Sequence, residues 1–325
     1  MRNARGAFRK TTTEEEEFAL MSNLPYDIAF YILTPIVGFV IGAIFYWVFR
    51  KVRARLQSRR GPPWYQTFAD VTKLLSKESI TPEIADKAIF YLAPLLAFAG
   101  YVVALLQLPF GNIYPPLSGD LIVVLIFLTV PGFAIVLGGL SSGSPYGAIG
   151  SSREITLLVA GEVPFVISAL VTGIQANSMN IFDIVAAQSQ FGPMAFHYPF
   201  ATISFLMGML LKLGRKPFDI PDAEVEIVAG PYTEYSGSLL GLFEISNALR
   251  WFVIPAFAAN LFFAGGLGNP VVFFIICLVL VILMSFIDAI NTRYRIDQAF
   301  KFVLIWATLL AIIDLVRATT GWALW

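Results

Sequence analysis

Cysteine and histidine are almost absent from this chain of 325 residues, which contains one of each, Cys277 and His197. Iron–sulfur clusters, bis-histidine haem and structural zinc all require several Cys or His ligands. The sequence also has no Walker A motif, no Gly-x-Gly-x-x-Gly after a strand and no Gly-x-Ser-x-Gly elbow. We therefore predict a chain that is no enzyme on its own and binds no metal or redox cofactor alone. We expect Cys277 to be a core side chain and His197 an ordinary residue of an outer loop.

Charged residues are also scarce, at 14% of the chain against 57% hydrophobic residues, and the mean hydropathy is +0.74. Soluble domains have about 25% charged residues. Apolar runs long enough to cross a bilayer as helices recur along the whole length, and the alternation typical of β-barrel strands does not dominate. We predict an all-α integral membrane protein with eight spans, the fifth of them short, at 28–49, 87–108, 120–140, 155–175, 199–213, 239–263, 270–290 and 301–318.

Basic residues are concentrated in alternate loops, which predicts the orientation of the chain. The loops at 50–86, 141–153, 212–238 and 291–300 carry many Lys and Arg residues, including Arg153, Lys212, Arg215 and Lys216, whereas the loops after spans 2, 4 and 6 carry none. By the positive-inside rule the first group is cytoplasmic and both termini lie outside the cell membrane. The domain organisation is then an N-terminal tail over residues 1–24 and a single transmembrane domain over 25–325. The basic residues of the tail conflict with this orientation.

The first basic loop contains an amphipathic helix. Trp64, Phe68, Val71 and Leu75 recur at helical spacing and form one apolar stripe. Such a helix can lie in the membrane interface. The alternative is a helix that packs on the spans to cover them.

Ionisable residues inside the spans are candidates for function, because each costs about 2.5–3.5 kcal/mol on insertion scales. Glu154 and Glu162 are eight positions apart, so both can face one cavity. Glu244 and Arg250 lie on a polar stripe of the sixth span, and Asp314 lies three residues before Arg317. These residues predict a path for ions or a coupling axis. The alternative is a set of structural ion pairs, which we favour for Asp314, and we expect Asp288 to be interfacial.

The segment 215–237 is acidic and contains three prolines, and it lies between two long apolar runs. It is longer than a connector needs to be. Its five carboxylates extend the predicted ion path, and they are Asp219, Asp222, Glu224, Glu226 and Glu234.

Four motifs resemble the complex I subunit 1 family, in order and over residues 28 to 320. They are Arg59-Arg60-Gly61-Pro62 with Ala69-Asp70, Pro145-Tyr146-Gly147-Ala148-Ile149-Gly150 with Arg153-Glu154, Pro217-Phe218-Asp219-Ile220-Pro221-Asp222-Ala223-Glu224 with Thr233-Glu234-Tyr235-Ser236, and Arg293-Tyr294-Arg295-Ile296-Asp297-Gln298. The first loop is shorter than the complex I pattern, and Gly230-Pro231 resembles the hydrogenase relatives. The chain thus resembles the hydrogenase-like branch of the family, with its membrane-bound [NiFe] hydrogenases, formate hydrogenlyase and archaeal sulfur-reducing relatives.

This resemblance implies a membrane subunit that anchors a peripheral redox arm and couples its electron transfer to H⁺ or Na⁺ translocation. The implied partners are hydrogenase-like large and small subunits, which carry the Fe–S clusters and the NiFe or related centre, antiporter-like and small membrane subunits, and the lipid bilayer. No nucleic-acid partner is implied. The residues implied in docking the peripheral arm are Arg59, Arg60, Gly61, Pro62, Arg153, Arg215, Pro217, Phe218, Tyr235, Arg293 and Arg295.

Three alternatives stay open. A quinone-binding subunit of a complex I-type oxidoreductase predicts a long apolar tunnel that opens under the amphipathic helix. A stand-alone secondary transporter predicts inverted repeats with broken helices. A purely structural anchor predicts acidic residues that serve assembly alone.

Overall fold

The computed structural model describes residues 2–113, 115, 117, 119–221, 224–266 and 268–321, and the side chains of these residues from 28 onward except 224 and 225. Over these residues the chain is helical, and its two β-bridges are isolated. Helices long and apolar enough to cross a membrane include the segment Ile28–Leu56 of α1 (Arg2–Leu56) and the segment Ile296–Thr320. The others are α3 (Lys87–Leu105), α4 (Leu121–Ser141), α5 (Pro145–Ala176), α10 (Gly237–Phe262) and α11 (Pro270–Ile290). The all-α membrane prediction is confirmed.

The fifth predicted span is the short helix α8 (Pro199–Lys212), which has 14 residues. At 1.5 Å per residue it is about 21 Å long, less than the roughly 30 Å of a hydrocarbon core. Two further short helices, α6 (Ile181–Phe191) and α7 (Met194–His197), precede it. Seven long spans and one short apolar helix therefore correspond to the eight predicted segments in the described part of the chain.

The last span changes its helical type along its length. It consists of α12 (Ile296–Lys301), a π-helical segment labelled η3 (Phe302–Ala307) and α13 (Thr308–Thr320). The carbonyl of Ala307, the last residue of the π-helical segment, accepts a hydrogen bond from the Ser204 hydroxyl of α8 at 2.7 Å.

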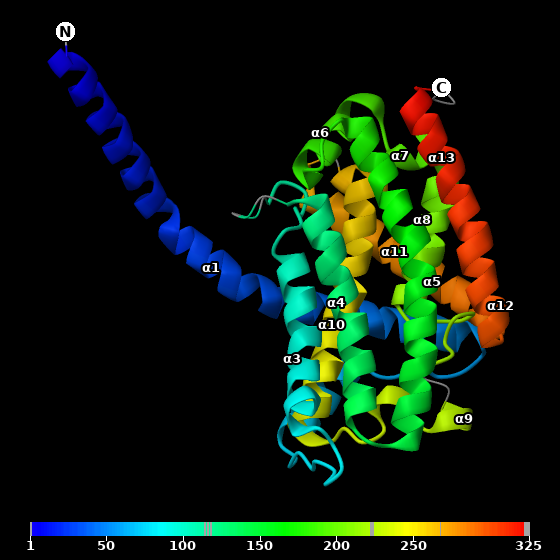
Figure 1. The fold of residues 1–325 in the computed structure, drawn as a ribbon. Coiled ribbons are helices and arrows are strands. Elements are labelled where there is room, and N and C mark those ends of the chain that lie inside the picture. The colour runs from blue at the N-terminus through cyan, green and yellow to red at the C-terminus, as the bar shows by residue number, and fades with distance from the viewer. Residues whose placement is uncertain are drawn as a thin grey trace.

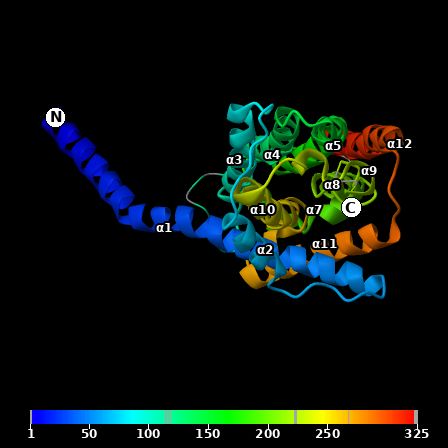
Figure 2. The same cartoon turned by 90° about the horizontal axis from the view of Figure 1, so that it is seen from below.

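Helix α10 lies at the centre of the bundle. Figure 2 shows α1 and α11 along one side of it, and α3, α4, α5 and α12 along the opposite side. Its residues Trp251–Phe262 are all buried, as is expected for a helix that is apolar all round. The approach of α1 is very close, because a Cβ added at Gly42 would lie 2.1 Å from the Ala248 carbonyl oxygen. Small residues permit such packing between membrane helices.

The two ends of the bundle differ. Figure 1 shows α9 (Glu224–Ile227) and the turn between α4 and α5 at one end, with α6, α7 and the C-terminus at the other. Short side chains fix where some helices begin: Asp86 accepts a hydrogen bond from the Ala88 N–H at the start of α3, and Asp120 accepts one from the Ile122 N–H at the start of α4. The segment after α2 is held on the start of α10 by the Ser79 and Ser238 hydroxyls, 2.8 Å apart.

The predicted amphipathic helix is α2 (Gln66–Leu75), which begins just after Gly61-Pro62-Pro63. It buries Thr67 and Val71, and Phe68 meets the Phe39 ring of α1 edge-to-face at 5.7 Å. Trp64 and Leu75 are largely exposed, at 62% and 53%. One side of α2 thus packs on the spans while aromatic and aliphatic groups beside it remain available to the membrane interface.

Candidate functional site

A small polar cavity lies between α3, α4, α5, α8 and α10. Its volume is about 30 Å³, and its ionisable lining residues are Tyr101, Glu154, Glu162, Lys212 and Arg250. A cavity needs about 10–15 Å³ by this measure to hold one water molecule, so this one has room for about two. Glu154 and Glu162 both line it, as their spacing of eight along one helix predicts.

Glu162 and Lys212 form the central ion pair of this cavity. The Lys212 ammonium also donates to the Leu128 carbonyl at 3.4 Å and lies 4.8 Å from the centre of the Phe165 ring. The two side chains are 18% and 9% exposed. Within the described residues, Oε2 of Glu162 is buried and accepts no hydrogen bond. Because a buried oxygen normally has a donor, this atom marks where a proton or a water molecule can enter the cluster.

Arg250 joins the cavity to the end of α8. Its guanidinium donates to the Lys212 carbonyl at 3.3 Å and to the Asn247 side-chain oxygen at 2.6 Å. The carbonyl groups of the last helical turn have no partner within the helix, and a cation near them is favourable. Arg250 therefore fixes the C-terminal end of α8 and, with it, the position of Lys212.

Sequence reasoning missed the location of Lys212 and the burial of Asp288. The basic-residue pattern groups Lys212 with the loop cations, but its place at the end of an apolar helix is a signal that its stem can reach back into the bundle. Asp288, near the end of α11, is 1% exposed, accepts a hydrogen bond from the Lys216 N–H at 3.1 Å and pairs with Arg53 at 3.3 Å. This pair joins α1, α11 and the loop after α8.

Two ion pairs hold the acidic loop on the bundle. Asp219 pairs with Arg293 at 2.9 Å, and Glu226 pairs with Arg153 at 2.6 Å. Glu234 is partly exposed. The predicted site residues Asp222 and the side chain of Glu224 lie outside the described residues. Arg153 and Arg293, predicted as docking residues, thus also position the loop itself.

Phe218 and Tyr235 anchor the loop from beneath. Phe218 is 2% exposed and meets the Tyr294 ring at 6.2 Å, and Tyr235 is 4% exposed and stacks on Phe90 with ring centres 4.1 Å apart. Pro217 is buried as well. These three side chains face the bundle, and the surface of the loop carries charged residues together with the exposed Val228.

Burial raises the pKa of the Tyr235 phenol well above its ordinary value, and the hydroxyl donates to the Phe90 carbonyl at 3.1 Å. A raised phenol pKa contributes stability that is fully present below the unfolded pKa of about 10 and is lost above the folded one. We therefore expect Tyr235→Phe to lower stability by about 1 kcal/mol, by the same amount at pH 6 and pH 9. Thermal unfolding of both proteins at the two pH values checks this, and a loss that appears at pH 9 alone would contradict it.

The remaining predicted docking residues lie around the end of the helix bundle that carries the acidic loop. Arg59 and Arg60 are exposed after the end of α1, beside Gly61, and the Pro62 carbonyl accepts a hydrogen bond from the Trp47 indole at 3.0 Å. Arg295 is exposed and pairs with Asp297 at 2.7 Å. These arginines are accessible to a partner.

Asp314 does not line the polar cavity. It is fully buried, pairs with Arg317 and accepts a hydrogen bond from the Ala201 N–H at 2.7 Å, at the start of α8. Arg317 also donates to the His197 carbonyl at 3.2 Å. Asp314 therefore caps α8 from another helix, at the end opposite to Lys212.

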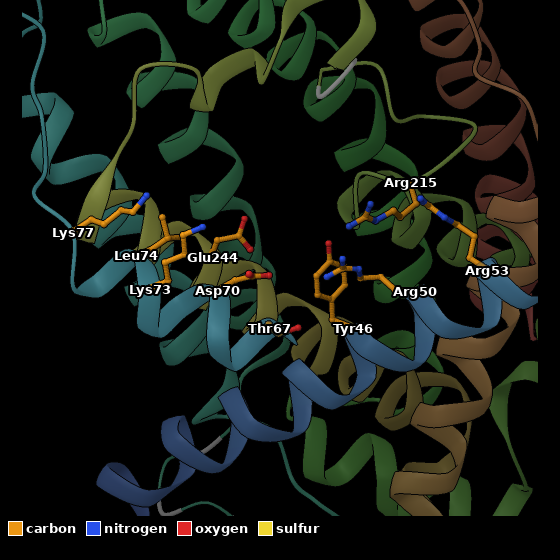
Figure 3. A pocket seen from close by; sticks show the side chains of 10 residues that line it. All are labelled: Tyr46, Arg50, Arg53, Thr67, Asp70, Lys73, Leu74, Lys77, Arg215 and Glu244. Carbon is orange, nitrogen blue, oxygen red and sulfur yellow. The ribbon is translucent and has the colours of Figure 1, made fainter. Parts of the chain in front are cut away.

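A second, larger cavity of about 500 Å³ lies beneath α2 (Figure 3). Its charged lining residues come from α1, α2 and the segment just after it, α10 and the loop after α8. Glu244, predicted as part of the ion path, belongs to this cavity together with Asp70. The quinone alternative predicted an apolar tunnel at this place, and the lining is instead mostly charged; it is composed of Tyr46, Arg50, Arg53, Thr67, Asp70, Lys73, Leu74, Lys77, Arg215 and Glu244.

The site is thus that of a polytopic membrane protein with a polar centre and a charged loop above it. Known proteins share this arrangement of sequence and fold. A family model described as NADH dehydrogenase matches residues 28–319. An NADH-quinone oxidoreductase subunit from Dehalococcoides mccartyi is 35% identical over 284 residues, which are 83% of this chain and 80% of that protein. The corresponding subunit from Syntrophobacter fumaroxidans is 32% identical over 309 residues, 88% of this chain and 92% of that one.

A solved structure is similar as well. A chain of the membrane-bound sulfane sulfur reductase, an archaeal respiratory membrane complex, superimposes with a TM-score of 0.82 at 30% sequence identity, over 90% of this chain and 99% of that one. The chain belongs to the NADH dehydrogenase family of membrane subunits, which is the complex I subunit 1 family. It is a multi-span subunit of the kind found in respiratory oxidoreductase complexes.

Proposed function

We propose that this chain is the anchor and coupling subunit of an ion-translocating respiratory complex, with no redox chemistry of its own. The observation that carries the proposal is the cluster of Glu154, Glu162, Lys212 and Arg250 around a cavity inside the bundle. Charged groups at such depth are costly unless they are paired or lead to water. A Glu–Lys pair with one carboxylate oxygen turned away from its partner can accept and release a proton without leaving either charge isolated.

The acidic loop links this cluster to the surface. Its ion pairs to Arg153 and Arg293 and its buried aromatic anchors hold it in one position above the bundle. Arg153 is one residue before Glu154, so a partner that displaces Glu226 from Arg153 changes the field at the first carboxylate of the path. We propose that a peripheral redox arm docks on this loop and on Arg59, Arg60 and Arg295, and that its electron transfer biases the occupancy of the path.

The proposed partners follow from the similar solved structure of the sulfane sulfur reductase and from the resemblance to the hydrogenase-like branch of the family. They are hydrogenase-like or sulfur-reductase-like large and small subunits that carry the NiFe or related centre and the Fe–S clusters, with antiporter-like and small membrane subunits beside the chain. In the described residues no three His, Cys, Asp or Glu side chains gather in a way that could hold a metal ion. We further propose that the loop end of the bundle faces the cytoplasm across the cell membrane, with both termini outside.

Glu162→Gln tests the proposal in the reconstituted complex. We expect the complex to lose stability but still to assemble and transfer electrons, while ion translocation falls to the level of empty vesicles, because the amide cannot carry a proton or hold the charge of Lys212. Translocation is measured as a change of pH or of Na⁺ concentration in the vesicle lumen. The measurement is repeated with a protonophore and, separately, with a Na⁺ ionophore, and the ionophore that abolishes the gradient identifies the ion. The control Glu83→Gln alters an exposed carboxylate. Translocation at the control rate in Glu162→Gln would remove Glu162 from the mechanism.

A quinone-binding subunit is the second candidate, because relatives named for NADH-quinone oxidoreductase are 35% identical and a cavity lies beneath α2. The charged lining argues against a neutral, apolar substrate at this position. Quinone-dependent turnover of the purified complex that is lost in Thr67→Leu, which places a bulkier apolar side chain in the cavity lining, would favour this second candidate.

A further inference from the structure

The cavity beneath α2 is strongly basic. Five cations and two carboxylates line it, and Figure 3 shows that they reach in from both sides. Arg50, Arg53 and Arg215 come from α1 and the loop after α8. Lys73 of α2 and Lys77, just after the end of α2, lie on the opposite side. A lining with such an excess of positive charge is suited to an anion.

Four of these five cations form no close ion pair within the described residues, and the two carboxylates of the lining, Asp70 and Glu244, offset only part of the positive charge. Over the described residues, Arg53 pairs with Asp288, whereas Arg50, Lys73, Lys77 and Arg215 form no ion pair within 4.0 Å. Of the two carboxylates, Asp70 already accepts a hydrogen bond from the Gln66 amide at 2.8 Å. Four cations thus face a partly enclosed space, where an opposite charge gains more than it would in bulk water.

Arg215 is held in a fixed orientation by aromatic rings. Its guanidinium carbon lies 5.0 Å from the ring centre of Phe49, 5.4 Å from that of Trp251 and 5.5 Å from that of Tyr46. Cation–π contacts occupy the faces of a guanidinium and leave the N–H groups in its plane available. A planar fork of donors held in this way matches the oxygens of a phosphate.

The position of the cavity identifies the source of the phosphate. Helix α2 forms one wall, and the exposed Trp64, Tyr65 and Leu75 on and beside it are side chains typical of the membrane–water interface. The volume of about 500 Å³ lies within the usual range of ligand pockets. We propose that this cavity binds the phosphate headgroup of an anionic membrane phospholipid, with Arg50 and Arg215 on one side and Lys73 on the other as its contacts.

Lipid retention by the purified complex tests this inference independently of ion translocation. The complex is placed in nanodiscs of phosphatidylcholine with or without phosphatidylglycerol, and native mass spectrometry counts the lipids that remain after activation. We expect one phosphatidylglycerol per complex to be retained in preference to phosphatidylcholine. The variant Arg50→Gln/Lys73→Gln, which loses one cation from each side, is expected to retain at least about tenfold less, since each charge-assisted contact is worth about a factor of ten.

The matched control is Arg55→Gln/Lys87→Gln, which removes two exposed cations outside the cavity lining. We expect it to retain phosphatidylglycerol as the unmodified complex does. Equal retention of the two lipids, or equal losses in both double variants, would overturn the proposal. Displacement of the bound lipid by millimolar inorganic phosphate would assign the site to free phosphate, and displacement by a short-chain quinone would assign it to quinone; either result also overturns the proposal.

Discussion

Lys212→Met is expected to destabilise the protein by about 3–5 kcal/mol and to abolish ion translocation. The substitution keeps the length of the apolar stem but leaves the Glu162 carboxylate buried without its ammonium partner, and breaking one side of a buried ion pair has costs of this size. The measurement is the midpoint of thermal unfolding of the purified complex in mild detergent, together with translocation in vesicles.

The paired variant Lys212→Met/Glu162→Gln distinguishes a lost ion pair from poor packing. With both charges gone, we expect most of the stability to return while translocation stays absent, because replacing a buried pair by groups of similar shape is often nearly neutral. Lys301→Met, at an exposed lysine, is the control and should be within about 0.5 kcal/mol of the original. A double variant as unstable as Lys212→Met would show that packing, not charge, is what matters at this position.

Asp314→Ala is expected to lower stability by a similar 3–5 kcal/mol. It leaves the largely buried Arg317 and the Ala201 N–H without their carboxylate acceptor. Asp314→Asn retains an oxygen that can cap α8, so we expect a smaller loss. Thermal unfolding measures both.

The comparison variant for this second prediction is Asp297→Ala. It removes an aspartate from an ion pair with Arg295 in which both side chains are mainly exposed, at 60% and 78%. Exposed pairs contribute about 0–1 kcal/mol. Equal effects of Asp297→Ala and Asp314→Ala would contradict the capping role of Asp314.

The spans and the amphipathic helix could be predicted because each depends on local pattern. Long apolar runs set the spans, and a polar break of Gly61-Pro62-Pro63 set the start of α2. The shortness of α8 was visible for the same reason. The helices α6 and α7 were missed because the loop between the fourth and fifth spans is not strongly periodic, although its length gave a signal that it holds some structure.

The contacts of the site could not be predicted, because they depend on how helices turn toward one another. Spacing indicated that Glu154 and Glu162 share a face of α5. It could not indicate that the partner of Glu162 is Lys212, fifty positions away on another helix, or that Asp288 pairs with Arg53 of the first span. The cavity beneath α2 likewise requires four separate segments to meet.

The two ends of α8 are each tied to a different helix, and this has a mechanical consequence. Asp314 of α13 holds the Ala201 end, and Glu162 of α5 holds Lys212, about 16 Å away along the helix axis. A short helix whose backbone hydrogen bonds stay intact moves as a rigid body, so a displacement of one end along the axis displaces the other end as well. Breaking the Glu162–Lys212 ion pair would therefore shift the contact between Asp314 and the Ala201 N–H, and the reverse also holds. The two ends of α8 would then be coupled without a continuous chain of ionisable groups between them.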